Sequence, residues 1–458
     1  MTNHKTVGIL GGGISGLTLG YLLQKGGIDV AVYEKESSPG GVIRSVKEGP
    51  WLVEFGPNTI LSRSAETWKL IDLLDLRDQV LFADEKAKRR YIVRDQQLHK
   101  LPDSPGSFLT TGLLSWKAKG RLLAEPFIRA PRKDDESIAS FFRRRLGTEP
   151  LEYGVNPFVS GIYAGTPESL SVKHTFSKLF ELEQQHGSIL KGMIKQRGRR
   201  GEQPFERGLI SFEGGLSRLV GELADRLGDA LQTDAAVGRL HQEDGRWTVT
   251  LDDGRTFQHR MVVSTLPVDS LKKLNLPDLS AEQAARLEKI DYAPVSVLAL
   301  GYERDQIGHP LDGFGALMPE AEPYYTLGVL FSSTLFSGRA PDGHALLTCF
   351  IGGQRHPEMA ALNLPGLEAR IIPEISQLLE IRGAPVFTTH RYWPRAIPQY
   401  HPGYDSVLQA LDRISEDHPG LLIDGNIRGG VSLPDRIASA YETTSYIEMF
   451  LQQQGSSE

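Results

Sequence analysis

The chain has 458 residues, a length that predicts about three structural units of ordinary size. Its formal net charge is −6, from 51 Lys and Arg against 57 Asp and Glu, which excludes an overall basic nucleic-acid-binding protein. An apolar content of 40 % and a charged content of 24 % are those of an ordinary globular protein. The single cysteine, Cys349, excludes an intramolecular disulfide and a cysteine-cluster metal site.

The hydropathy of the chain and the composition of its first six residues indicate where in the cell the protein is expected. No apolar run reaches about 18 residues, so we expect no membrane-spanning helix. Residues 1–6 are polar and lead directly into a predicted strand, which leaves little room for a secretory signal or a transit peptide. We therefore expect a cytoplasmic protein.

The N-terminal segment predicts a dinucleotide-binding unit. A buried strand at residues 6–10 is followed by Gly11-Gly12-Gly13-Ile14-Ser15-Gly16, a helix to about Lys25 and a second strand at 29–33 that leads into Glu34. Gly11 permits the tight turn, Gly13 lets the backbone approach a pyrophosphate, and Gly16 lets helix and strand pack closely. Glu34 follows at the distance where a carboxylate accepts hydrogen bonds from a ribose. A Gly-rich turn in an unrelated α/β unit is the alternative interpretation.

Two further runs favour FAD over NAD. The first is Lys35-Glu36-Ser37-Ser38-Pro39-Gly40-Gly41-Val42-Ile43-Arg44, and the second is Glu54-Phe55-Gly56-Pro57-Asn58-Thr59. In this order they resemble the flavin-containing amine oxidase superfamily, in which such segments line the flavin. Each run alone is equally consistent with a turn.

Later segments predict the remainder of a discontinuous flavin domain. Ala235-Ala236-Val237 precedes a predicted hairpin with an Asp-Gly turn at 252–254, and a buried strand is predicted at 261–267. A strand at 421–423 leads through Gly425 and Asn426 to a final helix at about 435–453. The resemblance implies that this strand–turn–helix lies against the flavin, where the helix N-terminus stabilises negative charge. It implies FAD contacts at Gly11, Gly12, Gly13, Ile14, Ser15, Gly16, Glu34, Lys35, Gly41, Val42, Arg44, Gly56, Pro57, Asn58, Thr59, Val237, Trp393, Gly425, Asn426, Val431, Ser432 and Leu433.

The predicted fold class is α/β, with a Rossmann-like FAD domain of the amine oxidase type, an α+β substrate domain and a helical insertion. We assign residues 1–85, 205–270 and 392–458 to the FAD-binding domain. Residues 86–106 and 271–391 form the substrate domain, whose β-rich runs at 295–300, 325–331 and 345–351 predict a mostly antiparallel sheet. Residues 107–204 form the helical insertion.

The helical insertion has a distinctive charge pattern. Trp116, Leu123 and Phe127 fall on one face of a predicted helix. Nine cations surround them against four acids, and the cations are Lys117, Lys119, Arg121, Arg129, Arg132, Lys133, Arg143, Arg144 and Arg145. One interpretation is a solvated helix face; the other is attachment to an anionic membrane surface, which would place the protein on the inner face of the cell membrane.

A more specific resemblance comes from the centre and the C-terminal half of the chain. Residues 156–167 (Asn-Pro-Phe-Val-Ser-Gly-Ile-Tyr-Ala-Gly-Thr-Pro) resemble the signature of the protoporphyrinogen oxidases. Residues 90–92 with 98–102, 327–333 with 339–341, 350–353 and 393–400 are similar to the same family. The resemblance spans essentially the whole chain in the correct order.

The resemblance also implies substrate contacts. Arg90 matches an arginine that pairs with a substrate propionate, and Gly165 matches a glycine whose carbonyl faces the pyrrole N–H groups. Leu317, Leu330 and Phe350 match apolar positions around the macrocycle. Without the resemblance, the sequence favours a surface arginine for Arg90, Gly165 is interpreted as a turn glycine, and the three apolar residues are equally consistent with ordinary core.

Two positions depart from the family pattern: Tyr404 replaces a common histidine, and Ser439 replaces a common glycine of the last helix. These departures put the local geometry in doubt, and not the chemistry. Hydrolase motifs are absent, histidines lack metal-ligand spacing, and no metal is expected. Cys349 lies in a predicted sheet strand and not near the C-terminal flavin segment, so we expect non-covalent FAD.

The resemblance implies FAD-dependent, oxygen-dependent oxidation of protoporphyrinogen IX to protoporphyrin IX in haem biosynthesis. No side chain is identified as the base. The alternatives are coproporphyrinogen III as substrate, another amine-oxidase-type flavoenzyme such as a carotenoid desaturase, and a non-enzymatic prenyl-protein-binding module of the same fold. The implied partners are the porphyrinogen, molecular oxygen, an anionic membrane surface, ferrochelatase or another haem-pathway enzyme, and a second copy of the chain in a homodimer.

Overall fold

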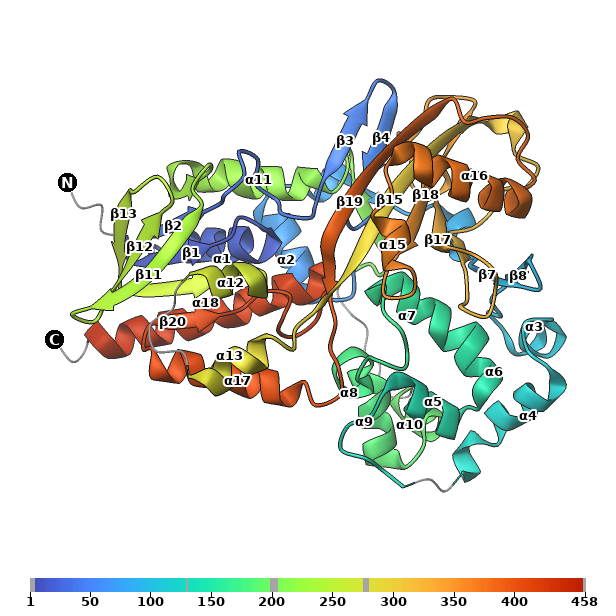
Figure 1. Ribbon diagram of the computed structural model, residues 1–458, viewed down its shortest axis with the longest axis horizontal. Coiled ribbons are helices and arrows are strands. Elements are labelled where there is room, and N and C mark those ends of the chain that lie inside the picture. Colours follow the sequence, from blue (N-terminus) through green and yellow to red (C-terminus); the bar gives the residue numbers. More distant parts are fainter. Residues whose placement is uncertain (1–4, 129–130, 198–204, 275–279, 456–458) are drawn as a thin grey trace.

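The computed structural model describes residues 5–128, 131–197, 205–274 and 280–455. Three parts are visible in Figure 1: a parallel sheet with its helices, beside which both termini lie, a larger sheet at the opposite end, and a group of short helices below that sheet. The α/β class and this combination of parts agree with the sequence prediction.

The parallel sheet has the strand order β10-β2-β1-β14-β20. Its strands are β10 (Leu231–Gln232), β2 (Val30–Tyr33), β1 (Val7–Leu10), β14 (Met261–Ser264) and β20 (Leu421–Ile423), and every neighbouring pair is parallel. Alternate side chains along β1 point to opposite faces, so Val7 and Ile9 enter one core and Leu10 enters another. The sheet is therefore buried on both faces, as a Rossmann-like sheet must be.

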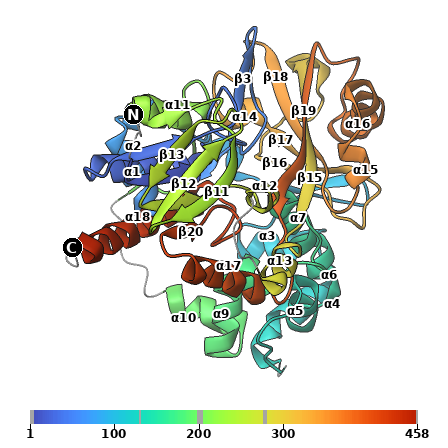
Figure 2. The ribbon, with the colours of Figure 1, turned by 60° about the vertical axis from the view of Figure 1, so that its left-hand side comes forward.

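Different elements cover the two faces of this sheet. The Ile9 face packs against α1 (Ile14–Lys25), α2 (Ala65–Leu73), α11 (Ser217–Leu227) and α18 (Leu433–Gly455). The Leu10 face packs against the antiparallel sheet of β11 (Val237–Glu243), β12 (Arg246–Leu251) and β13 (Thr256–His259), and against α12 (Val268–Lys273), α13 (Ala281–Leu287) and α17 (Asp405–Asp417). Figure 2 shows β11, β12 and β13 in front of this sheet. The predicted hairpin and the predicted final helix are confirmed, with the helix beginning at Leu433.

The larger sheet has the order β19-β15-β18-β17-β16-β7-β8. Its strands are β19 (Phe387–Pro398), β15 (Tyr292–Glu303), β18 (His344–Gly352), β17 (Thr326–Phe331), β16 (Gly315–Leu317), β7 (Tyr91–Arg94) and β8 (Gln97–Lys100). All neighbours are antiparallel except β16 and β7, which confirms the predicted, mostly antiparallel sheet. One face of this sheet is buried against α16 (Leu364–Leu379).

Smaller elements join the two sheets. The hairpin of β3 (Ser45–Glu48) and β4 (Trp51–Glu54) reaches the larger sheet, where Trp51 stacks on Phe387 at a ring separation of 4.9 Å. A short sheet is formed by β5 (Ile60–Leu61), β9 (Leu209–Phe212) and β6 (Val80–Phe82), and α14 (Ser332–Leu335) and α15 (Pro357–Ala360) lie at the ends of the larger sheet's strands. The predicted domain boundary at residue 392 falls inside β19, which is one continuous strand; the division itself stays a prediction.

The helical insertion contains more and shorter helices than its pattern suggests. They are α3 (Pro105–Thr110), α4 (Trp116–Leu123), α5 (Ile138–Arg145), α6 (Thr148–Pro150), α7 (Asn156–Tyr163), α8 (Val172–Thr175), α9 (Ser177–His186) and α10 (Ile189–Arg197), with a π-helical turn at Leu151–Val155. The prediction of one helix from Trp116 through Phe127 is wrong. The chain leaves α4 after Leu123 and forms a separate 3₁₀ turn at Glu125–Phe127, because Pro126 cannot donate the hydrogen bond that a continuing helix requires.

Several cations of this insertion are structural and not part of a basic surface. Lys119 is buried and donates to the carbonyls of Leu109 and Thr111, both at 2.8 Å. Arg121 donates to the carbonyls that end α5. Arg144 and Arg145 both bind the buried Glu183. Arg129 lies outside the described residues. The charge pattern therefore overstated the exposed positive charge.

The buried carboxylate of Glu183 should make the insertion sensitive to acid. Burial opposes its ionisation, but hydrogen bonds from Arg144 and Arg145 outweigh burial and lower its pKa. A carboxylate with a lowered folded-state pKa stabilises the fold fully above its unfolded-state pKa of about 4.3 and loses that contribution as the pH falls through the folded-state value. Glu183→Gln should therefore destabilise the protein at pH 7, by about 3–5 kcal/mol for a broken buried pair.

Thermal melts of Glu183→Gln from pH 7 down to pH 3 would measure this effect. The difference in melting temperature between the variant and the wild type should narrow as the pH falls below about 4, where residue 183 of the unfolded wild type becomes protonated, and should vanish below the lower pKa of the folded state. The exposed neighbour Glu181 offers the control, since Glu181→Gln should melt like the wild type. A difference in melting temperature that stays constant over the whole pH range would contradict the stabilising role of ionised Glu183.

Candidate active site

Four connections leave the carboxyl ends of the parallel strands and meet at one edge of the sheet. Gly11 follows β1, Glu34 follows β2, Thr265 follows β14, and Gly425 follows β20 by two residues. The position that a Cβ on Gly425 would take lies 3.1 Å from the Thr265 carbonyl oxygen, and the one on Gly11 lies 2.9 Å from the Thr265 hydroxyl. Ligands of open α/β sheets bind at this edge, so it is the expected place for a dinucleotide.

The first glycine loop has the geometry of a phosphate cradle. Gly11 has a φ of +104°, which favours glycine, and a Cβ on Gly16 would lie 2.0 Å from the Gly11 carbonyl oxygen. By contrast, no described atom lies within 4 Å of the position that a Cβ on Gly13 would occupy. No side chain of the described residues caps α1, so its first backbone N–H groups face the open side of the loop. An anionic phosphate fits this helix N-terminus.

A second backbone segment closes on the first. The Gly40 N–H donates to the Gly12 carbonyl at 2.7 Å, and a Cβ on Gly41 would lie 3.4 Å from the Gly13 Cα. The buried carboxylate of Glu34 accepts the Gly12 N–H at 2.7 Å and the Glu36 N–H at 3.0 Å. Glu34 is thus held beside the glycine loop, where a ribose attached to the cradled phosphate would lie.

The segment at residues 54–59 touches both the second loop and the larger sheet. A Cβ on Gly56 would lie 1.8 Å from the Val42 carbonyl oxygen, so only glycine fits there. The Asn58 side-chain amide donates to the Gly56 carbonyl at 3.0 Å. The indole N–H of Trp393, on β19, donates to the Phe55 carbonyl at 2.6 Å. The predicted flavin segments and the predicted flavin-contacting tryptophan are therefore neighbours.

The C-terminal flavin segment depends on Asp424, which the sequence did not single out. This buried carboxylate accepts the Gly425 N–H at 2.7 Å and hydrogen bonds from Ser439 and Thr443 of α18. Ser439, whose departure from the family pattern put the geometry in doubt, thus ties the last helix to the Gly425 turn. Ser432 and Asp435 cap α18 reciprocally, so the helix begins directly after Val431 and Ser432.

Some predicted cofactor residues have other partners. The Arg44 guanidinium donates to the Ser38 hydroxyl and to the carbonyls of Ser38 and Pro39, which fixes the second loop from its own side. Lys35 pairs with Glu36 at 3.2 Å on the surface. Val237 begins β11, near the end of β2, where the Ala235 N–H donates to the Glu34 carbonyl. Their predicted contacts with the cofactor stay predictions.

Three predicted substrate residues share one face of the larger sheet. The strand register places Leu317 beside Gly328 and Gly328 beside Phe350, with Leu330 two residues further along β17. All three side chains are partly exposed, while their strand neighbours Ala316, Val329 and Cys349 are buried against α16. This face is consequently an apolar surface available to a flat ligand, and α7 borders it, since a Cβ on Gly161 would lie 2.8 Å from the Leu317 side chain.

Arg90 differs from its two basic neighbours. Lys88 pairs with Glu85, and Arg89 pairs with Asp312. Among the described residues no carboxylate pairs with Arg90, an exposed residue whose guanidinium carbon lies 5.4 Å from the Phe314 ring centre. Desolvation and the nearby Arg63 cation lower the pKa of Arg90. An arginine without a carboxylate partner next to an apolar face fits a ligand that brings its own carboxylate.

Gly165 lies at the end of α7, close to the same region. A Cβ there would lie 2.3 Å from the Gln399 Oε1 and 2.8 Å from Leu170, so the position accepts only glycine without movement. The preceding residue, Ala164, has the left-handed φ of +49°, and its carbonyl accepts the Gln354 N–H just after β18. The turn is thus fixed to the larger sheet.

Sequence reasoning missed Thr265, Asp424 and Gln399 as residues of this region. Thr265 lies at the end of one predicted parallel strand, and Asp424 directly follows another. Because the carboxyl ends of parallel strands gather at one edge of the sheet, these positions were the available signal in the sequence. Gln399 gave no signal beyond its place in the Pro398-Gln399-Tyr400 motif, since its contacts join segments far apart in the chain.

Comparison with known proteins agrees with this geometry. The family model of the flavin-containing amine oxidoreductases matches residues 14–442. Protoporphyrinogen oxidase 2, chloroplastic/mitochondrial, from Arabidopsis thaliana is 33 % identical, with 98 % of this chain and 94 % of the relative covered. Coproporphyrinogen III oxidase from Bacillus subtilis (strain 168) is 27 % identical, with 94 % and 96 % covered.

Solved structures share the fold. A protein from Exiguobacterium sp. 255-15, provisionally named a protoporphyrinogen oxidase, superposes with a TM-score of 0.83 at 23 % identity, covering 97 % of this chain and 99 % of the other. Cyclohexylamine oxidase from Brevibacterium oxydans IH-35A superposes with a TM-score of 0.70 at 16 % identity over 97 % and 99 %. At these identities the likeness concerns the fold.

The chain belongs to the flavin-containing amine oxidoreductase family. It is an oxidoreductase whose cofactor is FAD, and the open space at Gly13, the uncapped α1 and the carboxylate of Glu34 fit the phosphates and ribose of that cofactor. Cys349 lies on the α16 face of the larger sheet, and burial raises the pKa of its thiol. It faces away from the flavin segments, which agrees with non-covalent attachment.

Two glycine substitutions should separate folding from cofactor binding. Gly13 has φ −80° and ψ 179°, which alanine adopts without strain, and no described atom crowds its Cβ position. Gly13→Ala should therefore fold as the wild type does but bind FAD at least tenfold more weakly, because the added methyl group occupies the phosphate side of the loop. Gly16→Ala should lose both stability and FAD, because its Cβ collides with the Gly11 carbonyl.

Flavin fluorescence titration of the apoproteins, combined with thermal melts, would test the pair. Normal FAD affinity in Gly13→Ala would show that the phosphates do not approach this glycine. Normal stability in Gly16→Ala would contradict the close packing of α1 on the first loop.

Proposed function

We propose that the protein oxidises protoporphyrinogen IX to protoporphyrin IX, with molecular oxygen as the electron acceptor. The single observation that carries the proposal is the apolar face of the larger sheet with Arg90 beside it, which forms no ion pair within the described parts of the chain. The names of the curated relatives support a porphyrinogen as the substrate class. FAD, when bound, accepts hydride from a carbon bridge of the substrate, and the reaction removes six electrons in three rounds.

In this proposal the chain's own residues position the substrate. Leu317, Leu330 and Phe350 cover the macrocycle with apolar surface and exclude water. Arg90 binds a propionate at the rim, and the Gly165 carbonyl accepts hydrogen bonds from the pyrrole N–H groups. No side chain is assigned as the base that removes the pyrrole protons.

The similarity to the relatives favours protoporphyrinogen over coproporphyrinogen, since the Arabidopsis thaliana relative named protoporphyrinogen oxidase 2 is 33 % identical and the Bacillus subtilis relative named coproporphyrinogen III oxidase is 27 % identical. Protoporphyrinogen carries two propionates and coproporphyrinogen four. Arg89, Arg94 and Arg395 are engaged by Asp312, Glu149 and Asp269. Arg90, and Arg391 of β19 in the same cross-strand row as Phe350, form no ion pair with the described residues, so a cation is present for each propionate of protoporphyrinogen.

The deciding assay compares both substrates in air. Porphyrin fluorescence should rise faster with protoporphyrinogen IX than with coproporphyrinogen III at equal concentration, and oxygen should be consumed in step with the porphyrin formed. A higher kcat/KM for coproporphyrinogen would transfer the proposal to that substrate. No enzymatic rise with either would reject a porphyrinogen oxidase.

Substitution of Arg90 should mainly raise KM. A propionate at the rim lies away from the reacting carbon, so its contact is similar in the ground and transition states. A hydrogen bond between charged groups contributes about 1.5–3 kcal/mol, and the exposed position of Arg90 favours the lower end, so Arg90→Ala should raise KM roughly tenfold. Arg90→Lys should recover part of the affinity, because a point charge cannot reproduce the guanidinium fork.

Arg89→Ala is the matched control for this experiment. It removes the adjacent arginine, whose partner is Asp312, and should leave KM near the wild-type value. Steady-state kinetics on FAD-saturated variants would measure both. Equal effects at the two positions would indicate a general loss of positive charge and remove Arg90 from the binding site.

We also propose that the helical insertion attaches the protein to an anionic membrane surface. Within the described parts of the chain, no helix is long and apolar enough to cross a bilayer. Trp116, Leu123 and Phe127 are nevertheless 72 %, 62 % and 82 % exposed, and Ile194 of α10 is 68 % exposed. A groove of about 640 Å³ beside Phe127 adds the cations Arg132 and Lys191. Exposed large apolar side chains next to cations are typical of interfacial attachment.

Vesicle flotation should detect this attachment. Binding should be stronger to anionic than to neutral vesicles and should weaken with salt, since each cation near such a surface contributes about 1 kcal/mol. Trp116→Ser combined with Phe127→Ser should abolish it, whereas Met449→Ser, which removes an exposed methionine of α18, should not. Equal recovery with anionic and neutral vesicles would contradict the electrostatic part of the proposal. Flotation of the double variant at wild-type levels would contradict the apolar part.

A further inference from the structure

Gln399, directly after β19, is completely buried and reaches the helical insertion. Its side-chain N–H group donates to the Tyr163 carbonyl at 2.8 Å and to the Ile397 carbonyl at 3.0 Å. Its Oε1 is buried without a hydrogen-bond partner among the described residues, and it is the atom that a Cβ on Gly165 would meet at 2.3 Å. The Gln399 amide therefore holds the Tyr163 end of this turn by a hydrogen bond, and its Oε1 occupies the space beside Gly165 at the other end.

The turn is also held from the sheet side. The Ala164 carbonyl accepts the Gln354 N–H at 2.7 Å, and a Cβ on Gly353 would lie 2.4 Å from the same oxygen. A left-handed alanine such as Ala164 persists only where its surroundings fix it. Gln399 and Gln354 together supply that fixation.

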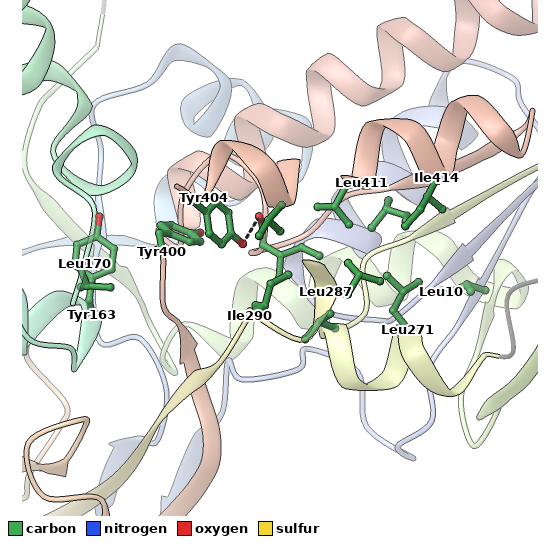
Figure 3. Close-up of a cluster of buried hydrophobic side chains, with 14 of the residues drawn as sticks. Leu10, Tyr163, Leu170, Leu271, Leu287, Ile290, Tyr400, Tyr404, Leu411 and Ile414 are labelled. Carbon is green, nitrogen blue, oxygen red and sulfur yellow. Dashed lines mark hydrogen bonds between the residues drawn. The ribbon is translucent and has the colours of Figure 1, made fainter. Parts of the chain in front are cut away.

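The next residue reaches the flavin loop. The Tyr400 hydroxyl donates to the Asn426 carbonyl at 2.5 Å, and the Tyr400 carbonyl accepts the Ser171 N–H at 2.7 Å. Figure 3 shows Tyr163, Tyr400 and Tyr404 in sequence across this junction, with the Tyr404 hydroxyl bonded to the backbone of the same loop. Residues 399 and 400 therefore connect the Gly165 turn to the loop that carries Gly425 and Asn426.

We propose that Gln399 is a positioning residue that fixes the Gly165 turn relative to the flavin loop, and so sets how the reacting carbon of the substrate faces the cofactor. This inference rests on the proposed function, in which Gly165 contacts the pyrrole N–H groups. Reacting atoms must approach to about 3–3.5 Å, and a misplacement of about 1 Å can lower a rate about a hundredfold. Gln399 itself is not required to touch the substrate.

The kinetic test uses Gln399→Leu, which keeps the size of the side chain and removes its hydrogen bonds. In anaerobic stopped-flow experiments with protoporphyrinogen, flavin reduction should slow by about tenfold to a hundredfold. Reoxidation by oxygen and FAD affinity should stay near the wild-type values, because these depend on other residues, and KM should change less than the rate of flavin reduction, because Arg90 and the apolar face supply the other substrate contacts. A general structural defect would alter all four quantities together.

Tyr404→Phe is the matched control. It removes a buried hydroxyl that donates to the Ile427 carbonyl of the same loop at 2.9 Å, but Tyr404 forms no hydrogen bond with the described atoms of the Gly165 turn. It should lower the melting temperature and leave the rate of flavin reduction unchanged. Wild-type flavin reduction in Gln399→Leu, or an equal slowing in Tyr404→Phe, would overturn the inference.

A second arm of the experiment tests the contact between Gln399 and Gly165 by protein stability and needs no substrate. Gly165→Ala should lower the melting temperature of the holoprotein, and the double variant Gly165→Ala/Gln399→Ala should melt higher than Gly165→Ala alone, because the amide that the new methyl meets is gone. If Gly165→Ala is insoluble, recovery of soluble protein in the double variant supports the contact. A double variant no better than Gly165→Ala contradicts it.

The two arms distinguish failure of this inference from failure of the proposed function. A wild-type flavin that protoporphyrinogen does not reduce rejects the proposed function, and with it the catalytic part of the inference. A normal reduction of the wild type with no effect of Gln399→Leu rejects the inference alone.

Discussion

Strand β19 is the constraint on which the relative position of the flavin loops and the apolar face depends. It pairs with β15 along almost its whole length, so its backbone is fixed to the larger sheet. Trp393 of this strand reaches the Phe55 carbonyl of the 54–59 flavin segment, and Tyr400, two residues after the strand ends, reaches the Asn426 carbonyl of the last flavin segment. A rigid strand that is hydrogen-bonded on both sides of a cofactor site limits the sliding of one part over the other. Such an arrangement suits a reaction whose rate depends on the distance between two bound molecules.

A second link between the two sheets is electrostatic. Glu54, at the end of β4, accepts hydrogen bonds from the Ser45 hydroxyl and the Leu216 N–H and pairs at 3.2 Å with Arg339, which precedes β18. Both side chains are only 3 % exposed. Burial raises the pKa of Glu54 despite the Arg339 cation, and burial lowers the pKa of Arg339 despite the carboxylate. Loss of either partner would leave an unpaired buried charge, so the pair favours the joined arrangement of the two parts whether or not it adds net stability.

The sequence predicted best where one short segment carries all the required chemistry. The glycine loop and Glu34 follow from local spacing, because a strand, a turn and a helix N-terminus determine a phosphate cradle by themselves. The role of the second loop came from the resemblance. The grouping of Leu317, Leu330 and Phe350 came from resemblance, and the strand register gives its structural reason.

The prediction of a helix through Phe127 was wrong because Pro126 interrupts the helix despite the helical spacing of the apolar residues. The basic surface was overestimated because Lys119 binds backbone carbonyls and Arg145 binds a carboxylate distant in the sequence. Contacts between distant segments, such as that of Gln399 with Tyr163, leave no local pattern.

Two unfavourable local features, one of the backbone and one of a side chain, occur side by side at the Gly165 turn. Ala164 occupies the left-handed region, and the buried Gln399 Oε1 has no partner among the described residues, a situation that costs about 1–3 kcal/mol. A non-glycine residue in the left-handed region adds about 1 kcal/mol or more. Neither feature improves the packing, since an alternative apolar side chain at 399 would fill the space without a buried polar atom. Sequences that satisfy local preferences elsewhere usually depart from them where function requires a particular backbone position. The coincidence of a left-handed alanine, a glycine that no larger residue replaces without movement and an unsatisfied amide therefore supports the proposal that this turn is held in place to position the substrate.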